Sequence, residues 1–133
     1  QPLSQRIIDG APDAYFASLP VNAMVAAMNQ AEIPAAVSYT AGTYVCNDVM
    51  YQVLHALSTR FPDTRGTFLH VPFATEQVVE KNAAAAEKAA AAEKTRQVPS
   101  MSLEMMTRGL QVALETTLAN DVDLADSESG TTC

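Results

Sequence analysis

The sequence predicts an α/β fold with three α/β/α layers and a mainly parallel sheet. Short apolar segments rich in β-favouring residues alternate with longer segments in which apolar residues recur every three or four positions. This alternation is typical of a parallel sheet that is covered by helices on both faces. The length of 133 residues, with 48% hydrophobic and 17% charged residues, fits one globular domain and excludes wholesale disorder.

The first predicted helix follows an irregular segment, residues 1–18. We expect Ser18 to cap this helix and Pro34 to end it. Its apolar stripe has the spacing i, i+3, i+4, i+7 and consists of Val21, Met24, Val25 and Met28. The short apolar segment 35–39 after it predicts a buried strand.

A second strand–helix unit is predicted in the middle of the chain. Thr40–Gly42 has the composition of a turn, and a helix is expected from about residue 44 to residue 58. The stripe of this helix consists of Met50, Val53, Leu54 and Leu57. Residues 67–71 are rich in β-favouring types and predict a second strand, which Pro72 ends.

The last part of the chain is predicted to be mostly helical. A helix from Thr75 runs into two copies of AAAAEK, and residues 83–94 predict an Ala-rich helical insertion without large apolar side chains. A final helix after Pro99 is expected to have Ser100 or Ser102 as its cap. The stripe expected to be buried on it consists of Leu103, Met106, Leu110, Ala113 and Leu114.

Two predicted strands are too few for a stable sheet. The chain also opens on Gln1, in what reads as the middle of a loop. We therefore expect residues 1–119 to be the C-terminal part of a single α/β domain whose N-terminal strands are absent from this chain. Residues 120–133 are acidic and without Lys or Arg, which predicts a disordered tail.

The composition excludes several classes of function. Eight basic and fifteen acidic residues give a net charge of −7, which disfavours nucleic acid and anionic membrane surfaces as partners. Apolar runs are far shorter than the roughly 20 residues that cross a bilayer. The two cysteines cannot build a disulfide framework and suit a reducing compartment such as the cytoplasm. No metal-ligand spacing is present, so no metal site is expected.

Cys46 and His70 are the residues most able to carry out chemistry. Cys46 follows the first predicted strand in the first turn of a helix, and His70 lies near the end of the second strand. Because the carboxyl ends of parallel strands meet at one edge of a sheet, the two side chains can lie close together. Unpaired amides at a helix N-terminus stabilise a thiolate nucleophile and an oxyanion, and an imidazole can transfer the proton.

Structural roles also remain open for these residues. A cysteine among apolar residues is often a small core residue, and a lone histidine on a strand is often a packing residue. His55, in the middle of a predicted helix, is expected to be a surface or packing residue.

Two separated motifs carry a resemblance to a known family. SYTAGTYVCNDVMY at 38–51 and GTFLHVPF at 66–73 resemble pyroglutamyl peptidase type I, also called pyrrolidone-carboxylate peptidase. Segments 14–38 and 99–114 resemble the flanking helices of that family. The AAAAEK copies and the acidic tail have no counterpart in it.

The resemblance implies a cytosolic cysteine peptidase without a cofactor. It acts on peptides with an N-terminal pyroglutamyl (5-oxoproline) residue and forms homodimers or homotetramers. By motif match, Cys46 is the nucleophile, His70 its proton-transfer partner, and Val45 lines the pocket for the lactam ring. The acidic catalytic residue of the family lies before the start of this chain. Two alternatives stay open: a truncated, non-enzymatic relative or assembly fragment with an unreactive buried cysteine, and another kind of thiol hydrolase.

Overall fold

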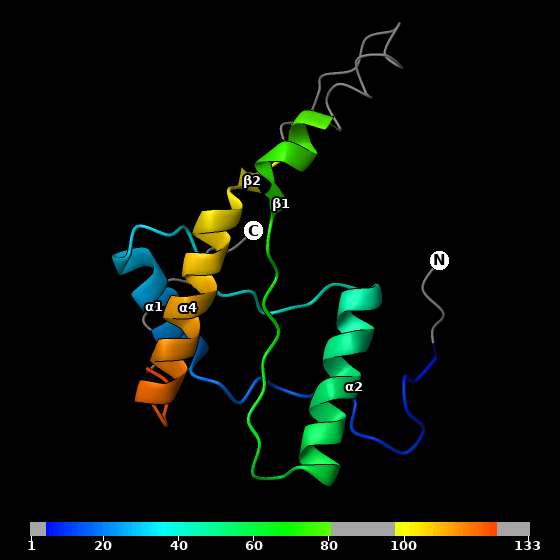
Figure 1. The fold of residues 1–133 in the computed structure, drawn as a ribbon. Coiled ribbons are helices and arrows are strands. Elements are labelled where there is room, and N and C mark those ends of the chain that lie inside the picture. The colour runs from blue at the N-terminus through cyan, green and yellow to red at the C-terminus, as the bar shows by residue number, and fades with distance from the viewer. Residues whose placement is uncertain (1–4, 81–97, 125–133) are drawn as a thin grey trace, which may run out of the picture. The chain divides into compact units, whose positions relative to one another are not determined.

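The α/β class is confirmed by helices and a parallel strand pair. The computed structural model describes residues 5–80 and 98–124 (Figure 1). The labelled elements are α1 (Val21–Gln30), α2 (Val45–Arg60), β1 (Phe73–Ala74), β2 (Ser100–Met101) and α4 (Leu103–Ala119). A further helix begins at Thr75, and its described part runs to Glu80. The predicted helical insertion at 83–94 lies outside the described residues.

The chain divides into two compact units. The first comprises Gln1–Leu69 and Val112–Cys133, and the second comprises His70–Gln111. The helix α4 contributes residues to both.

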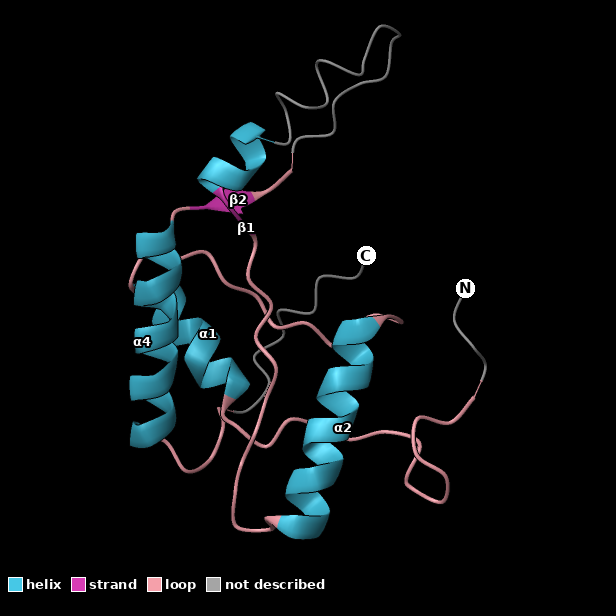
Figure 2. Ribbon diagram, turned by 45° about the vertical axis from the view of Figure 1, so that its right-hand side comes forward, coloured by secondary structure: helices cyan, strands magenta, loops and turns pink. Residues whose placement is uncertain are grey.

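The parallel strand pair lies in the second unit (Figure 2). Phe73 pairs with Ser100 and Ala74 with Met101. The Ala74 N–H donates a 2.9 Å hydrogen bond to the side-chain oxygen of Gln77, one turn into the following helix. Strand β1 therefore leads directly into a helix.

Of the two serines expected to cap the last helix, Ser102 is the one that does so. Its hydroxyl oxygen accepts a 3.2 Å hydrogen bond from the Met105 N–H, and its carbonyl accepts one of 3.0 Å from Met106. This is the geometry of a helix cap, and it confirms one of the two predicted alternatives. Ser100 lies in β2 instead.

Both strands predicted from the sequence are wrong in position. Residues 35–39 form no strand, and both backbone groups of Ala35 bond to the side chain of Asn29, at 3.0 and 3.1 Å. Asn29 thus takes the hydrogen bonds that a neighbouring strand makes in a sheet. Residues 67–71 are likewise not a strand, and the first described strand begins only after Pro72.

The first unit buries one face of α1. Met24 and Met28 of the predicted stripe are buried, whereas Val21 and Val25 are half-buried and Ala23, outside the stripe, is buried too. In both ribbon views α1 lies beside the part of α4 that belongs to this unit (Figures 1 and 2). There α4 contributes buried Val112 and Ala113.

The buried stripe predicted on α4 is wrong for its leucines. Leu103, Leu110 and Leu114 are 63%, 43% and 65% exposed, whereas the small residues Gly109 and Ala113 are buried. Apolar residues surround most of this helix, so periodicity alone does not identify the inward face. Small side chains let the backbone approach its neighbour closely, and the leucines remain on an exposed face.

The N-terminus of α1 is capped from the far end of the chain. Asp123 accepts hydrogen bonds from the Asn22 N–H at 3.1 Å and from the Ala23 N–H at 3.0 Å. Ser18, the predicted cap, makes no such bond. It pairs with Gly66 instead, donating its N–H to the Gly66 carbonyl and accepting the Gly66 N–H at its hydroxyl, both at 2.9 Å.

Asp123 lies in the segment predicted to be a disordered tail. Its contacts join this segment to α1 within the first unit, and residues 125–133 lie outside the described part. Burial raises the pKa of Asp123, but hydrogen bonds from the Ala23, Asn22 and Leu124 amides outweigh it and hold the pKa below its ordinary value of 3.8. The ionised carboxylate is therefore the form that the fold stabilises.

We expect Asp123→Ala to lower the free energy of unfolding by roughly 1 kcal/mol at neutral pH, the typical effect of losing a helix cap. Because the folded pKa is depressed, this contribution is fully present above about pH 4 and is lost as the pH falls through the folded pKa. Urea titrations at pH 7 and pH 3 measure it, and the difference between variant and wild type should shrink at pH 3.

Asp121→Ala is the matched control for this experiment. Asp121 is fully exposed and lies 3.6 Å from Arg65 in a surface ion pair, which contributes little to stability. An equal loss of stability in both variants would contradict a capping role for Asp123.

Candidate active site

A tight turn precedes α2 and fixes where the helix begins. The Ser38 hydroxyl donates to the Thr40 carbonyl at 2.8 Å, and the Gly42 N–H donates to the Thr40 hydroxyl at 3.0 Å. Gly42 has a φ of +81°, a left-handed conformation that favours glycine. Tyr44 is then extended, and α2 starts at Val45.

Cys46 lies in the first turn of α2, as predicted. Its thiol is free and half-buried. The Tyr44 carbonyl accepts hydrogen bonds from the Asn47 and Asp48 amides at 3.0 and 3.2 Å. The amides of Val45 and Cys46 precede these and have no partner among the described residues, as is usual for the first turn of a helix. These two donors are available beside the sulfur.

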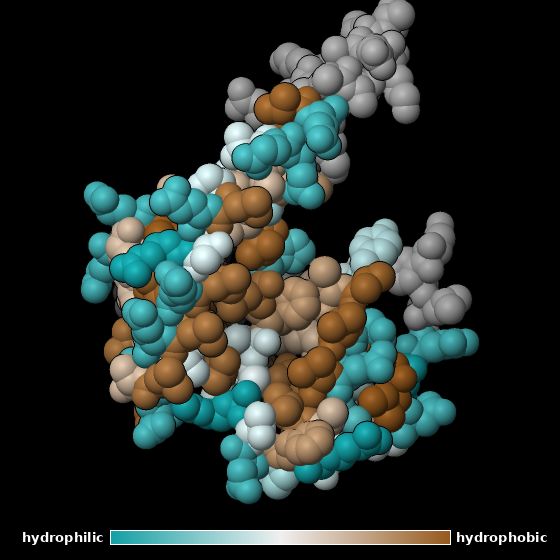
Figure 3. Space-filling model, in the orientation of Figure 1, coloured by the Kyte–Doolittle hydropathy of each residue, from teal (hydrophilic) through white to brown (hydrophobic). Residues whose placement is uncertain are grey.

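Val45 stands at the start of an exposed apolar stripe. Val45, Val49 and Val53 follow one another at intervals of four and are 73%, 43% and 47% exposed. The hydropathy surface shows apolar atoms running along α2 (Figure 3). Cys46 is thus bordered on one side by apolar surface.

His70 lies between α2 and β1 and is exposed. It belongs to the second compact unit, whereas Cys46 and Val45 belong to the first. The structure therefore places Cys46 and Val45 next to each other, and the pairing of Cys46 with His70 stays a prediction.

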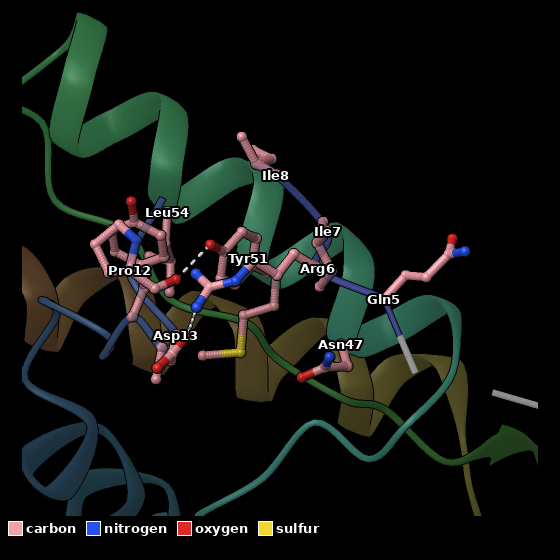
Figure 4. Close-up of a pocket in the computed structure, with 12 residues that line it drawn as sticks. Gln5, Arg6, Ile7, Ile8, Pro12, Asp13, Asn47, Tyr51 and Leu54 are labelled. Carbon is pink, nitrogen blue, oxygen red and sulfur yellow. Dashed lines mark hydrogen bonds and ion pairs between the residues drawn. The ribbon is translucent and has the colours of Figure 1, made fainter. Parts of the chain in front are cut away.

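A cavity on the other side of α2 was not expected from the sequence. It has a volume of about 430 Å³ and lies between the loop 5–15 and α2 (Figure 4). The Tyr51 hydroxyl donates a 2.6 Å hydrogen bond to the Pro12 carbonyl, and Arg6 forms an ion pair of 3.1 Å with Asp13. The first contact holds the loop against α2, and the second joins two residues of the loop.

Aromatic residues extend this attachment. Tyr15 and His55 share a hydrogen bond of 2.7 Å between the hydroxyl and Nδ1, and Tyr15 packs edge-on against Tyr51. Desolvation, and then the nearby Tyr15, raise the pKa of Tyr51 above its usual value of 10.0, so its hydroxyl remains a donor at neutral pH. The tyrosines are visible in the sequence, but their spacing does not reveal the path of an irregular loop.

Within the described segments, no helix has the length and apolar character needed to cross a bilayer.

The comparisons with known proteins all point to one family. The family model described as pyroglutamyl peptidase matches residues 1–120. The pyrrolidone-carboxylate peptidase of Thermococcus onnurineus is 44% identical over 117 residues, covering 88% of this chain and 51% of the relative. That of Levilactobacillus brevis is 46% identical over 114 residues, covering 86% and 49%.

Solved structures show the same likeness. Pyroglutamyl peptidase I from Bacillus amyloliquefaciens superposes with a TM-score of 0.79 at 34% identity, covering 96% of this chain and 53% of that one. A mutant pyrrolidone carboxyl peptidase from Pyrococcus furiosus gives 0.73 at 35%, covering 86% and 50%. The chain spans about half the length of the curated relatives it matches. With the family model covering most of its residues, this chain belongs to the pyroglutamyl peptidase family.

Proposed function

We propose that this chain supplies the nucleophile and the proton-transferring imidazole of a cysteine peptidase that removes N-terminal pyroglutamate from peptides. The observation that carries the proposal is the position of Cys46, a half-buried free thiol in the first turn of α2. Family membership supplies the substrate class. Neighbouring backbone N–H groups can stabilise the thiolate of Cys46 and the oxyanion that forms when it attacks a carbonyl.

In the proposed reaction, the Cys46 thiolate attacks the carbonyl carbon of the amide that follows pyroglutamate. The oxyanion accepts hydrogen bonds from amides at the start of α2. The protonated imidazole of His70 gives its proton to the leaving nitrogen, the C–N bond breaks, and a thioester forms. A water molecule, deprotonated by His70, then attacks the thioester, the C–S bond breaks, and pyroglutamate leaves with the Cys46 thiolate and the protonated His70 restored.

Val45 is proposed to line the pocket for the lactam ring. Its exposed apolar side chain adjoins the nucleophile on α2. Pyroglutamate has no free amine, so an apolar surface accepts it readily. An ordinary N-terminus carries an ammonium group, which is costly to bury there.

Residues 1–119 are proposed to be the C-terminal part of one peptidase domain that acts in the cytoplasm as a homodimer or homotetramer. The exposed leucines on α4 support the proposal that the chain is part of a larger domain. A part of a domain leaves uncovered the apolar surface that the complete domain buries. Full activity then requires the acidic group and the strands that the family supplies from its N-terminal half.

Alkylation of the full-length protein tests the proposed function. We expect iodoacetamide at mildly acidic pH to modify Cys46 faster than Cys133, because thiolate is the reacting form. Mass spectrometry maps the modified cysteine. The rate of hydrolysis of a pyroglutamyl-amide reporter should fall in proportion to the fraction of Cys46 that is modified. A pyroglutamyl ligand should slow both the alkylation of Cys46 and this loss of activity.

Two results would contradict the proposal. Equal labelling of Cys46 and Cys133, without reporter hydrolysis, favours the non-enzymatic alternative. Cys46-dependent hydrolysis of simple esters but of no pyroglutamyl amide favours another kind of thiol hydrolase.

A further inference from the structure

The cavity between the loop 5–15 and α2 presents one face of that helix. Asn47, Met50, Tyr51 and Leu54 line it at the spacing i, i+3, i+4, i+7. Its volume of about 430 Å³ falls in the range of small-ligand pockets, roughly 300–1,000 Å³. Figure 4 shows the loop residues opposite this helix face, with Arg6 and Asp13 joined by their ion pair.

Cys46 stands at the border between this cavity and the valine stripe. Met50 lies one turn after Cys46 and therefore on the same side of the helix, and Asn47 is its direct neighbour. On the other side, Val49 is three residues from Cys46 and belongs to the exposed stripe. Two different surfaces thus flank the sulfur.

Amide hydrolysis needs such an arrangement, because the acyl group and the leaving amine extend in opposite directions from the attacked carbon. If the lactam lies over Val45, the leaving peptide extends toward Asn47 and Met50. One extended residue spans about 3.3–3.6 Å, so the residue after pyroglutamate lies on the side of α2 where Asn47 and Met50 line the cavity.

Resting on the proposed function, we propose that this cavity receives the side chain of the second substrate residue and favours large apolar or aromatic ones. Apolar and aromatic side chains make up most of its lining, with Met50 and Leu54 from α2 and Ile8 from the loop, and the Arg6–Asp13 ion pair adds a polar part. Burying a large apolar side chain there stabilises binding in proportion to the area removed from water. The tethered loop keeps the cavity formed before substrate arrives.

The test compares pyroglutamyl-phenylalanine amide with pyroglutamyl-glycine amide in the full-length protein. We expect wild-type kcat/KM to favour the phenylalanine substrate by about 10-fold or more. Met50→Trp and Ile8→Trp fill the cavity from opposite walls, and either should bring the ratio close to one while glycine-substrate hydrolysis continues. Gln52→Trp is the matched control, since Gln52 is exposed on α2 and does not line the cavity.

A wild-type ratio near one, or an unchanged ratio in the cavity variants, would overturn the subsite and leave the proposed function standing. Absence of hydrolysis of every pyroglutamyl substrate would overturn both.

Discussion

Replacing Cys46 with alanine is expected to lower pyroglutamyl-amide hydrolysis on the order of 10⁴-fold or more, because loss of the nucleophile prevents the thioester from forming. The change removes one sulfur atom from a half-buried position, so the fold should be retained. Initial rates with a fluorogenic pyroglutamyl amide measure the effect, and circular dichroism monitors the fold.

Cys133→Ala is the matched control, since it makes the same chemical change at the last residue of the chain. We expect it to keep wild-type rates. Turnover that persists in purified Cys46→Ala would show that Cys46 is not the nucleophile.

Substitution of His70 should have the next largest effect. We expect His70→Ala to lower kcat by roughly 10²–10⁴-fold, the usual contribution of general acid–base catalysis. KM should change much less, because the imidazole is proposed to move a proton and not to hold the substrate. Steady-state kinetics across pH 5–9 measure both constants.

Two further variants separate proton transfer from a packing role. Imidazole added to His70→Gly should partly restore turnover, which a merely structural histidine would not show. His55→Gln keeps a hydrogen-bonding group next to Tyr15 and should remain active. Unchanged kcat in His70→Ala would exclude His70 from the reaction.

Helices were predictable from this sequence because their signals are local. Apolar spacing located α1, α2 and α4, and Ser102 was one of two serines expected to cap the last helix. Strands were not predictable, because a strand is defined by its partner. The backbone of Ala35 bonds to the side chain of Asn29, and Phe73 pairs with Ser100 across the repeat segment.

In the candidate site, too, the features set by local sequence were predictable and those set by long-range contacts were not. The first-turn position of Cys46 follows from the turn before it, and the sequence reveals that turn. The cavity depends on an irregular loop attached by Tyr51 and Pro12, whose spacing of 39 residues has no periodic signal. The Cys46–His70 pairing depends on the same kind of long-range geometry.

The link between Asp123 and α1 has a consequence for the order of folding. Asp123 bonds to Asn22 across 101 residues, so the first helix of the chain is synthesised long before its cap. At about 5–20 residues per second, a ribosome needs roughly 5–20 s to add the intervening length. During that interval α1 must persist without this anchor, and proteases should cut nascent or C-terminally truncated chains near residue 22 more readily than the finished protein.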